Sequence, residues 1–391
     1  MARRRNCESL GGAARLGTLR AGLASLAVLS AGALGPVCGS GGIHVTNPPP
    51  EPVLVDTHGE VDSGGVDALV AEVEQQRGLG FIQRPTLELV ADGDPRLAPL
   101  RDAARALEAC PVADVQPSLP RGGCFPDPSL EWIVCAAPPD LGDARRALRR
   151  LLDAQNYPAL ARAAPVLRGD PGVAVRSLLA ASANGASGRR GPPPDPKLPD
   201  LFDLPAIQVE SQGAPAEGCV AIAENFLSLQ NDPEAPFRRP PLSTEQLVSP
   251  RRYWAGEKPR VLVGGPPRVG DCERVGDESV GVARLLVTLL AKGGSVPGPV
   301  LGAWQGDRGV RFACADGRAP WIYVAELSDA PRAARFAAEI QRLLPGEFAG
   351  PSEARALGRR VIVASGGLSQ SITDWATALV SQPLSGLPGI D

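Results

Sequence analysis

The spacing of hydrophobic positions along the chain predicts a mixture of helices and strands. Apolar residues between 66 and 73 recur at intervals of three and four, as on one face of an amphipathic helix that ends at Gly78. Residues 85–90 alternate between apolar and polar side chains, which is typical of a half-buried strand. By the same criteria, helices are predicted over residues 97–109, 175–183, 279–291, 331–344 and 369–379, and strands over 130–136, 260–263, 300–304, 310–313, 321–325 and 360–364. The pattern favours an α+β fold.

Residues 1–38 have the order of an export signal, in which arginines precede an uncharged apolar run over residues 21–37. That run is short for a membrane span of about twenty residues. Two processing sites stay open. Gly-Pro-Val before Cys38 resembles a lipobox, which would make Cys38 a lipid anchor in the membrane, whereas Ala-Gly-Ala suits cleavage after Ala33. We therefore expect an exported protein, either periplasmic or a lipoprotein of the outer membrane or cell surface.

The mature chain would have 391 − 38 = 353 residues, with 35 basic and 42 acidic side chains. This length suffices for one large domain or two smaller ones. No basic stripe is present, so nucleic acid is not an expected partner. Residues 39–64 are rich in glycine, serine and proline and are interpreted as a flexible tether. The chain's two histidines, His44 and His58, lie in this tether and are interpreted as solvated.

Cysteine usage agrees with export. Of the eight cysteines, Cys7 and Cys38 fall in the signal region, which leaves an even number in the mature chain. In an oxidising compartment this predicts up to three disulfides. We expect one bridge within residues 110–135 and one that joins later cysteines, while the absence of a C-x-x-C pair argues against zinc ligation. The disulfide candidates are Cys110, Cys124, Cys135, Cys219, Cys272 and Cys314.

Residues 240–259 have the most particular order in the chain, P-P-x-S-T-E-Q-x-x-x-P-x-x-Y-x-x-G-E-x-P. This order resembles the signature of a family of exported bacterial zinc metallopeptidases that carry an H-E-x-x-H helix. The signature residues are Ser243, Thr244, Glu245, Gln246, Tyr253, Gly256 and Glu257. A hydroxyl followed by an acidic side chain predicts a helix start, and the aromatic residues suit packing against a core. We interpret the segment as a structural clamp, with a place at the border of a substrate cleft as the alternative.

The resemblance places the catalytic helix within residues 145–160. In such a helix two histidines bind zinc and the intervening glutamate polarises the attacking water. The corresponding residues here are Ala154, Gln155 and Pro158, none of which can serve those roles, and Pro158 should interrupt the helix. The third ligand position, a glutamate in the family, corresponds to Ala180. Glu217 is the alternative placement, where it would lack the two histidine partners. We therefore expect neither zinc nor any other cofactor.

The resemblance implies a zincin-like α+β fold, with long helices packed on a mixed sheet and a small C-terminal α+β unit. Residues 65–239 form the metallopeptidase-like region, with a proline-rich loop at 185–205, and residues 240–391 form the signature and C-terminal region. The order Ala-Trp-Gln-Gly-Asp-Arg at 303–308 is similar to a family turn.

Two functions follow from these observations. The first is a pseudoenzyme of the cell envelope, which would bind an unidentified envelope protein or peptide, or serve a structural role. The alternative is a hydrolase with a relocated, zinc-independent carboxylate site. Its candidate residues are Asp271, Glu273, Asp277 and Glu278, because a close carboxylate pair can perform acid/base chemistry. A charge run of this kind is more typical of a solvated loop.

Overall fold

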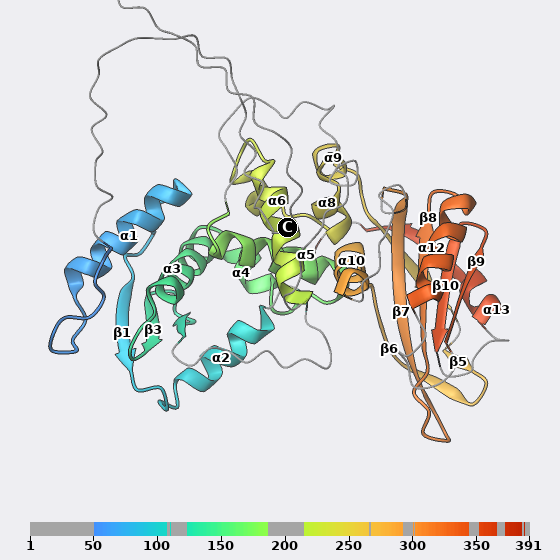
Figure 1. The fold of residues 1–391 in the computed structure, drawn as a ribbon, viewed down its shortest axis with the longest axis horizontal. Helices are drawn as coiled ribbons and strands as arrows, with labels where there is room; N and C mark the ends of the chain where they lie inside the picture. The colour runs from blue at the N-terminus through green and yellow to red at the C-terminus, as the bar shows by residue number, and fades with distance from the viewer. Residues whose placement is uncertain are drawn as a thin grey trace, which may run out of the picture. The chain divides into compact units, whose positions relative to one another are not determined.

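The computed structural model describes residues 51–107, 110, 123–186, 215–265, 267–291, 300, 302–343, 352–365, 372–384 and 387. Residues 51–391 form one compact unit, in which helices and several sheets are mixed (Figure 1). The predicted signal region, including Cys38 and Ala33, lies outside the described residues, as do His44 and the proline-rich loop beyond Ala186. No helix in the described part of the chain has the length and apolar character needed to cross a membrane.

The first structural region is a three-stranded sheet with helices on both faces. Its strands are β1 (Thr86–Val90), β2 (Cys124–Pro126) and β3 (Trp132–Ala136), with β3 in the centre, parallel to β1 and antiparallel to β2. Helices α1 (Ser63–Arg77) and α3 (Leu141–Asn156) pack on the face that contains Leu87 and Ile133. Helix α2 (Leu97–Ala106) packs on the face that contains Val134. Burial of both faces explains why β3 is almost continuously apolar.

A group of helices forms the largest core. It contains α4 (Pro158–Ala163), α5 (Gly169–Ala183), α6 (Pro215–Ser228), α7 (Ala235–Arg238), α8 (Thr244–Val248), α9 (Pro250–Trp254) and α10 (Val282–Ala291). Phe226 and Tyr253 meet edge to face in this core, with ring centroids 5.1 Å apart. The same core continues to Trp304 and Phe336, so the signature residues share it with the C-terminal part of the chain. The structure therefore shows no separation at residue 240.

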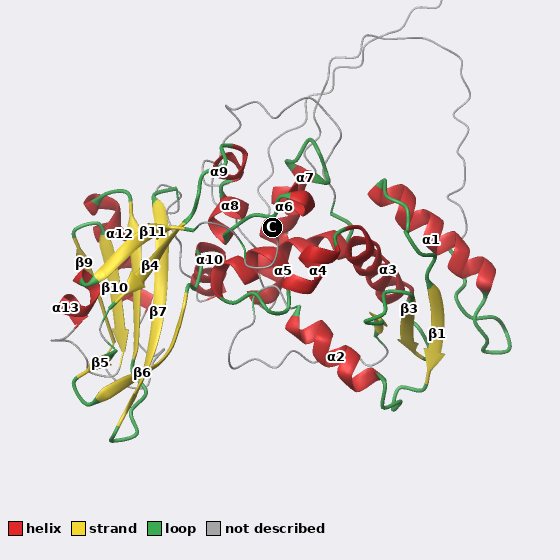
Figure 2. Ribbon diagram, turned by 180° about the vertical axis from the view of Figure 1, so that it is seen from behind, coloured by secondary structure: helices red, strands yellow, loops and turns green. Residues whose placement is uncertain are grey.

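The C-terminal part is built on a six-stranded antiparallel sheet, which Figure 2 shows from behind. Its spatial order is β5 (Arg268–Val269), β6 (Cys272–Glu278), β7 (Trp304–Cys314), β8 (Trp321–Leu327), β10 (Arg360–Ser365) and β9 (Ser352–Leu357). Helix α12 (Ala330–Leu343) packs against β8, β9 and β10. A two-stranded sheet of β4 (Arg260–Gly264) and β11 (Leu379–Pro383) packs on the other face, near α13 (Ile372–Thr377).

Alternation along the central strands directs side chains to these two cores. On β8, Tyr323 and Ala325 join the helical core, whereas Ile322 and Val324 face the β4–β11 side. This is the period-two pattern of a sheet that is covered on both faces. It confirms the strand predicted at 321–325, and the predicted helix at 331–344 is confirmed by α12.

Several sequence predictions need correction. The helix placed at 145–160 begins earlier, at Leu141, and Pro158 interrupts it as expected: α3 ends at Asn156 and Pro158 begins α4, because proline lacks the N–H that a helix interior requires. The strand predicted at 310–313 lies within β7, but the one predicted at 300–304 is wrong, because Val300 is helical, residues 302–303 form a turn and β7 begins at Trp304. Residues 304–308 of the Ala-Trp-Gln-Gly-Asp-Arg stretch are therefore strand rather than turn. A register shift between Trp304 and Gly306 bends β7 at that point.

The predicted tether extends too far along the chain. Leu54 is buried, and an antiparallel bridge joins Val55 to Val61 before α1 begins at Ser63. The backbone makes a close approach here, since a Cβ on Gly65 would lie 1.7 Å from the Val53 carbonyl oxygen. The chain therefore joins the folded unit about ten residues earlier than its composition indicated.

Three disulfides link Cys110 to Cys219, Cys124 to Cys135, and Cys272 to Cys314. The second lies within residues 110–135 and the third joins two later cysteines, as predicted. Both of these bridges connect residues that are directly opposite on neighbouring antiparallel strands. The first connects the segment after α2 to α6, across 109 residues of sequence, and the sequence did not specify this pairing.

Candidate binding cavity

A cavity of about 460 Å³ opens among α2, the turn between β2 and β3, the α3–α4 junction and α5. This volume lies within the range of small-molecule binding sites. Alanine, leucine and proline side chains dominate its wall, among them Leu100 from α2, Leu130 from the β2–β3 turn and Leu179 from α5. Among the described residues, four ionisable side chains also line it: Asp127, Arg150, Asp153 and Arg162.

Ala154, Pro158 and Ala180 all line this cavity. They come from three different helices, α3, α4 and α5, and Ala180 is well separated from the other two in sequence. A methyl group, a pyrrolidine ring and a second methyl group offer no atom that can coordinate a metal ion. Glu217, the alternative position for a third ligand, is exposed at the start of α6 and does not line the cavity.

The amide of Gln155 holds the backbone rather than a ligand. Its Oε1 accepts a hydrogen bond from the backbone N–H of Gln83 at 3.0 Å. Its Nε2 donates to the carbonyl oxygens of Gln83 at 2.9 Å and of Leu130 at 2.7 Å. The end of α3 is thereby tied to the segment before β1 and to the β2–β3 turn, which carries part of the cavity wall.

Asp153 is held in a buried ion pair at the cavity wall. Arg77 Nη2 donates to Asp153 Oδ1 at 2.5 Å, and both side chains are 1% exposed. The Ser182 hydroxyl donates to Asp153 Oδ2 at 2.5 Å. Burial raises the pKa of the Asp153 carboxyl, while the charge of Arg77 opposes that shift. Arg77 also stacks over the Phe237 ring at 4.6 Å, so this cluster joins α1, α3, α5 and α7.

The signature residue Thr244 holds α8 to the start of α5. Its backbone N–H and its hydroxyl both donate to Asp170 Oδ1, at 3.0 and 2.5 Å, and the hydroxyl accepts from the Ala283 N–H at 3.1 Å. The predicted hydroxyl cap of this helix is therefore wrong in detail. Ser243 is the N-cap residue but makes no capping bond through its side chain, and the Thr244 hydroxyl serves another helix.

The remaining signature residues make similar internal bonds. Gln246 accepts from the Leu242 N–H at 2.7 Å and donates to the Glu257 carbonyl oxygen at 2.7 Å. The Tyr253 hydroxyl donates to the Arg239 carbonyl oxygen at 2.9 Å, and Gly256 has a left-handed backbone with φ of 65°. These contacts fit the structural clamp, because each one joins segments of the fold.

Glu245 and Arg252 form an ion pair within the same segment. Arg252 also donates to the carbonyl oxygens of Trp304, at 2.8 Å, and Gly302, at 2.9 Å. The signature is thereby tied to the start of β7.

Asp170 and Asp307 are two buried carboxylates next to the signature segment. Burial and the nearby negative charge of Asp307 raise the pKa of Asp170 to about 7. Asp307 accepts hydrogen bonds from the Gly281 N–H and the Tyr323 hydroxyl, both at 2.9 Å, and from the Ser279 hydroxyl. Burial also raises the pKa of Asp307. The adjoining cavity is about 10 Å³, room for about one water molecule, so this pair has no space for a substrate.

The acidic run at 271–278 is mostly strand β6 rather than the solvated loop that its charge indicated. Glu273 pairs with Arg268 at 3.3 Å, and Asp277 pairs with Arg274 and Arg308. These carboxylates therefore neutralise neighbouring arginines instead of forming an acid/base pair. Asp277 and Glu278 lie at the C-terminal end of β6, and Asp271 lies just before its start.

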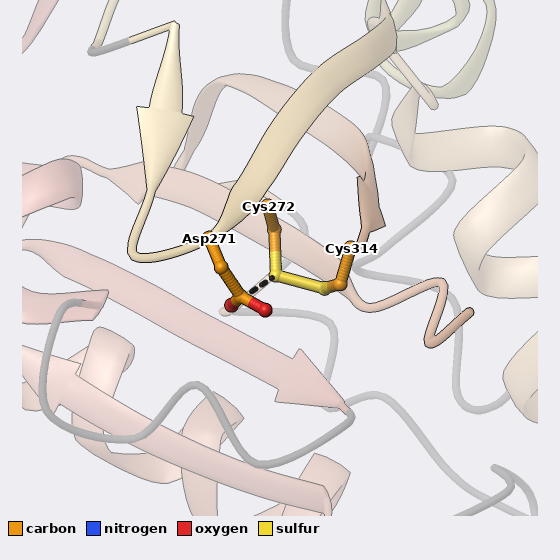
Figure 3. A group of neighbouring side chains, drawn as sticks. All are labelled: Asp271, Cys272 and Cys314. Atoms are coloured by element: carbon orange, nitrogen blue, oxygen red, sulfur yellow. Dashed lines mark hydrogen bonds between the residues drawn. A yellow bond between two sulfur atoms is a disulfide. The ribbon is translucent and has the colours of Figure 1, made fainter. Parts of the chain in front are cut away.

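Figure 3 shows Asp271 beside the bridge between Cys272 and Cys314. The carboxylate and sulfur atoms lie within 4.8 Å of one another, a spacing that could hold a metal ion. Each sulfur is bonded to the other, however, so neither is a thiolate, the form in which cysteine binds metals. The Cys272 sulfur contacts Asp271 Oδ1 at 3.4 Å. The arrangement is therefore a cross-strand disulfide with an acidic neighbour.

Comparison with known proteins returned no match: no family model matches the chain, and no curated protein or solved structure matches it. Sequence reasoning identified three positions of the cavity wall, at Ala154, Pro158 and Ala180. It missed Arg150 and Asp153, whose helix carries several charged side chains with no local sign of which ones face inward. It also missed Asp170, since a carboxylate in the first turn of a helix ordinarily favours the exposed, positive end of the helix dipole.

Proposed function

We propose that this protein is an exported, non-catalytic relative of the zinc metallopeptidases, and that the cavity holds an apolar ligand in place of a catalytic metal. The observation that carries the proposal is the convergence of Ala154, Pro158 and Ala180 on one cavity. The resemblance assigns all three to metal-ligand positions, and it does so without knowledge of the fold. Their convergence supports a zincin-like arrangement of α3 and α5.

The chemistry of the wall favours binding over turnover. Asp153 is occupied by Arg77 and Ser182, and Gln155 is occupied by backbone groups. No group with the geometry of a water-activating base is therefore left on this part of α3. Apolar walls stabilise a ligand by about 25 cal/mol for each Å² of apolar surface removed from water, which suits recognition of an apolar group.

An envelope location belongs to the same proposal. Three disulfides suit an oxidising compartment, and lipidation of Cys38 would hold the protein at a membrane. A peptide or another envelope protein could supply the apolar group, as could a free apolar molecule.

The proposal is tested by binding of a neutral fluorescent probe, N-phenyl-1-naphthylamine, to the oxidised mature protein. We expect saturable binding at one site, which Ala180→Phe abolishes by filling the cavity. Ala338→Phe is the matched control, because Ala338 is exposed on α12, outside the cavity lining, and that variant should bind as the wild type does. Equal binding by wild type and the Ala180 variant would refute the cavity as the site.

Metal content tests the non-catalytic part of the proposal. We expect purified mature protein to contain far less than one equivalent of zinc and to show no proteolysis of casein that a chelator abolishes. One tightly held zinc ion for each molecule, with chelator-sensitive proteolysis, would overturn it.

A further inference from the structure

Four arginines project from α3, and three of them have partners in the protein. Arg145 pairs with Glu72 at 3.0 Å, and Arg146 pairs with Asp143. Arg149 donates to Gln76 and to the Ala183 carbonyl oxygen. The fourth, Arg150, makes neither a hydrogen bond nor an ion pair with any residue that the structure describes, and it lines the cavity.

Arg150 is a cation in a largely apolar setting. Burial lowers the pKa of its guanidinium, because removal from water penalises the charged form. Arginine nevertheless stays protonated in proteins, so the charge persists. Arg150 is half-buried, and a partly desolvated charge without a direct ion-pair partner costs free energy, which pairing with an anion that enters the cavity would offset.

Among the described residues, the other charged side chains of the wall make no ion pair with Arg150, so a ligand could supply its counter-ion. Asp153 is neutralised by Arg77, and Asp127 accepts the backbone N–H of Ser129 within its own turn at 2.8 Å. Arg162 is exposed, and among the described residues it makes no hydrogen bond or ion pair. Apart from the Arg77–Asp153 pair, the part of the wall that the structure describes therefore carries two positive side chains and one negative one.

We propose that the cavity binds a single-chain amphiphile with a carboxylate head, whose hydrocarbon tail packs against the alanine, leucine and proline wall while the carboxylate pairs with Arg150. This inference rests on the proposed function, since it names the ligand class of the same cavity. A cavity of about 460 Å³ lies within the range of small-molecule sites, so it has room for a medium-chain fatty acid. A planar guanidinium and a carboxylate can form two parallel charge-assisted hydrogen bonds.

The test compares dodecanoate with dodecanol, which have the same tail and differ in charge. Calorimetric titration of the oxidised mature protein should give tighter binding of dodecanoate, by about tenfold or more, the range of a charge-assisted hydrogen bond. Arg150→Gln should remove this preference and leave dodecanol binding unchanged, which also shows that the variant is folded. Arg150→Lys should retain part of the preference.

Arg146→Gln is the matched control, since Arg146 lies on the same helix, pairs with Asp143 and does not line the cavity. That variant should keep the wild-type preference. Equal affinities for dodecanoate and dodecanol in the wild type would overturn the carboxylate inference while the proposed function stands. If neither ligand nor the neutral naphthylamine probe binds, the proposed function itself fails. A leucine-terminated peptide that binds more tightly than dodecanoate, and depends on Arg150, would overturn the amphiphile in favour of a peptide carboxylate.

Discussion

Replacement of Asp170 by asparagine should stabilise the protein at pH 8 and leave its stability at pH 4 nearly unchanged. Burial and the charge of Asp307 raise the pKa of Asp170 from an ordinary 3.8 to about 7. The folded state therefore holds this proton more tightly than the unfolded chain does. The contribution of Asp170 to the free energy of unfolding is therefore fully present below about pH 4, declines as the pH rises, and is lost above about pH 7.

The size of the effect follows from the shift. One pKa unit corresponds to about 1.4 kcal/mol, so a shift of about three units destabilises the folded wild type by about 4 kcal/mol at pH 8 relative to pH 4. Asparagine carries no charge, and its side-chain oxygen can accept the two hydrogen bonds from Thr244. Asp307 is unchanged in the variant, so its own contribution to the pH dependence is present in both proteins.

The measurement is the free energy of unfolding in urea from pH 4 to pH 8, with the disulfides intact. The difference between variant and wild type should grow by about 4 kcal/mol across this range. Asp102→Asn is the control, because Asp102 is exposed and pairs with Arg105 at the surface, and its difference should stay within about 1 kcal/mol. Parallel stability curves for the Asp170 variant and the wild type would refute the assignment of a buried, protonated carboxyl.

Two further stability predictions follow from the structure. Arg77→Met should lower the free energy of unfolding at pH 7 by about 3–5 kcal/mol, since it leaves Asp153 buried without its cation, and adding Asp153→Leu should restore most of the loss. A cost below about 1 kcal/mol for the single change would contradict a buried pair. Replacement of Cys110 and Cys219 by serine opens a loop of 109 residues and should lower the free energy of unfolding in urea by about 5 kcal/mol. Replacement of Cys124 and Cys135, whose bridge between β2 and β3 closes only 11 residues, should lower it by about 3 kcal/mol. The reverse order of costs would count against the chain-entropy explanation.

The local pattern of apolar residues, glycine and proline predicted much of the secondary structure. The three-and-four spacing at 66–73 predicts α1, and Gly78 ends that helix with a left-handed φ of 67°. Pro158 predicts the break after α3, since its ring excludes a helix interior wherever it lies in the fold. An even number of cysteines predicts disulfides without knowledge of the pairing. Each of these inferences depends on a residue and its immediate neighbours in the chain, so it can be made from the sequence without the fold.

The strand β6 shows where local pattern fails. Its charged residues predicted a solvated loop. In the structure, arginines from β5 and β7 pair with Glu273 and Asp277, which allows these carboxylates to lie in a sheet. Those arginines come from other strands, and only the pairing of β5, β6 and β7 brings them to the carboxylates. A strand with a charged, partly exposed face therefore cannot be distinguished from a loop by its own composition.

The sequence by itself determined the approximate positions of several helices, among them α1, α2 and α12, and that the side chains of Ala154, Pro158 and Ala180 offer no metal ligand. Only the tertiary structure decided that these three residues share one cavity, and that Arg150 faces it while the other arginines of α3 find partners elsewhere. The physical reason is that side-chain chemistry belongs to each residue, whereas burial and pairing depend on segments that are distant along the chain and adjacent only after folding.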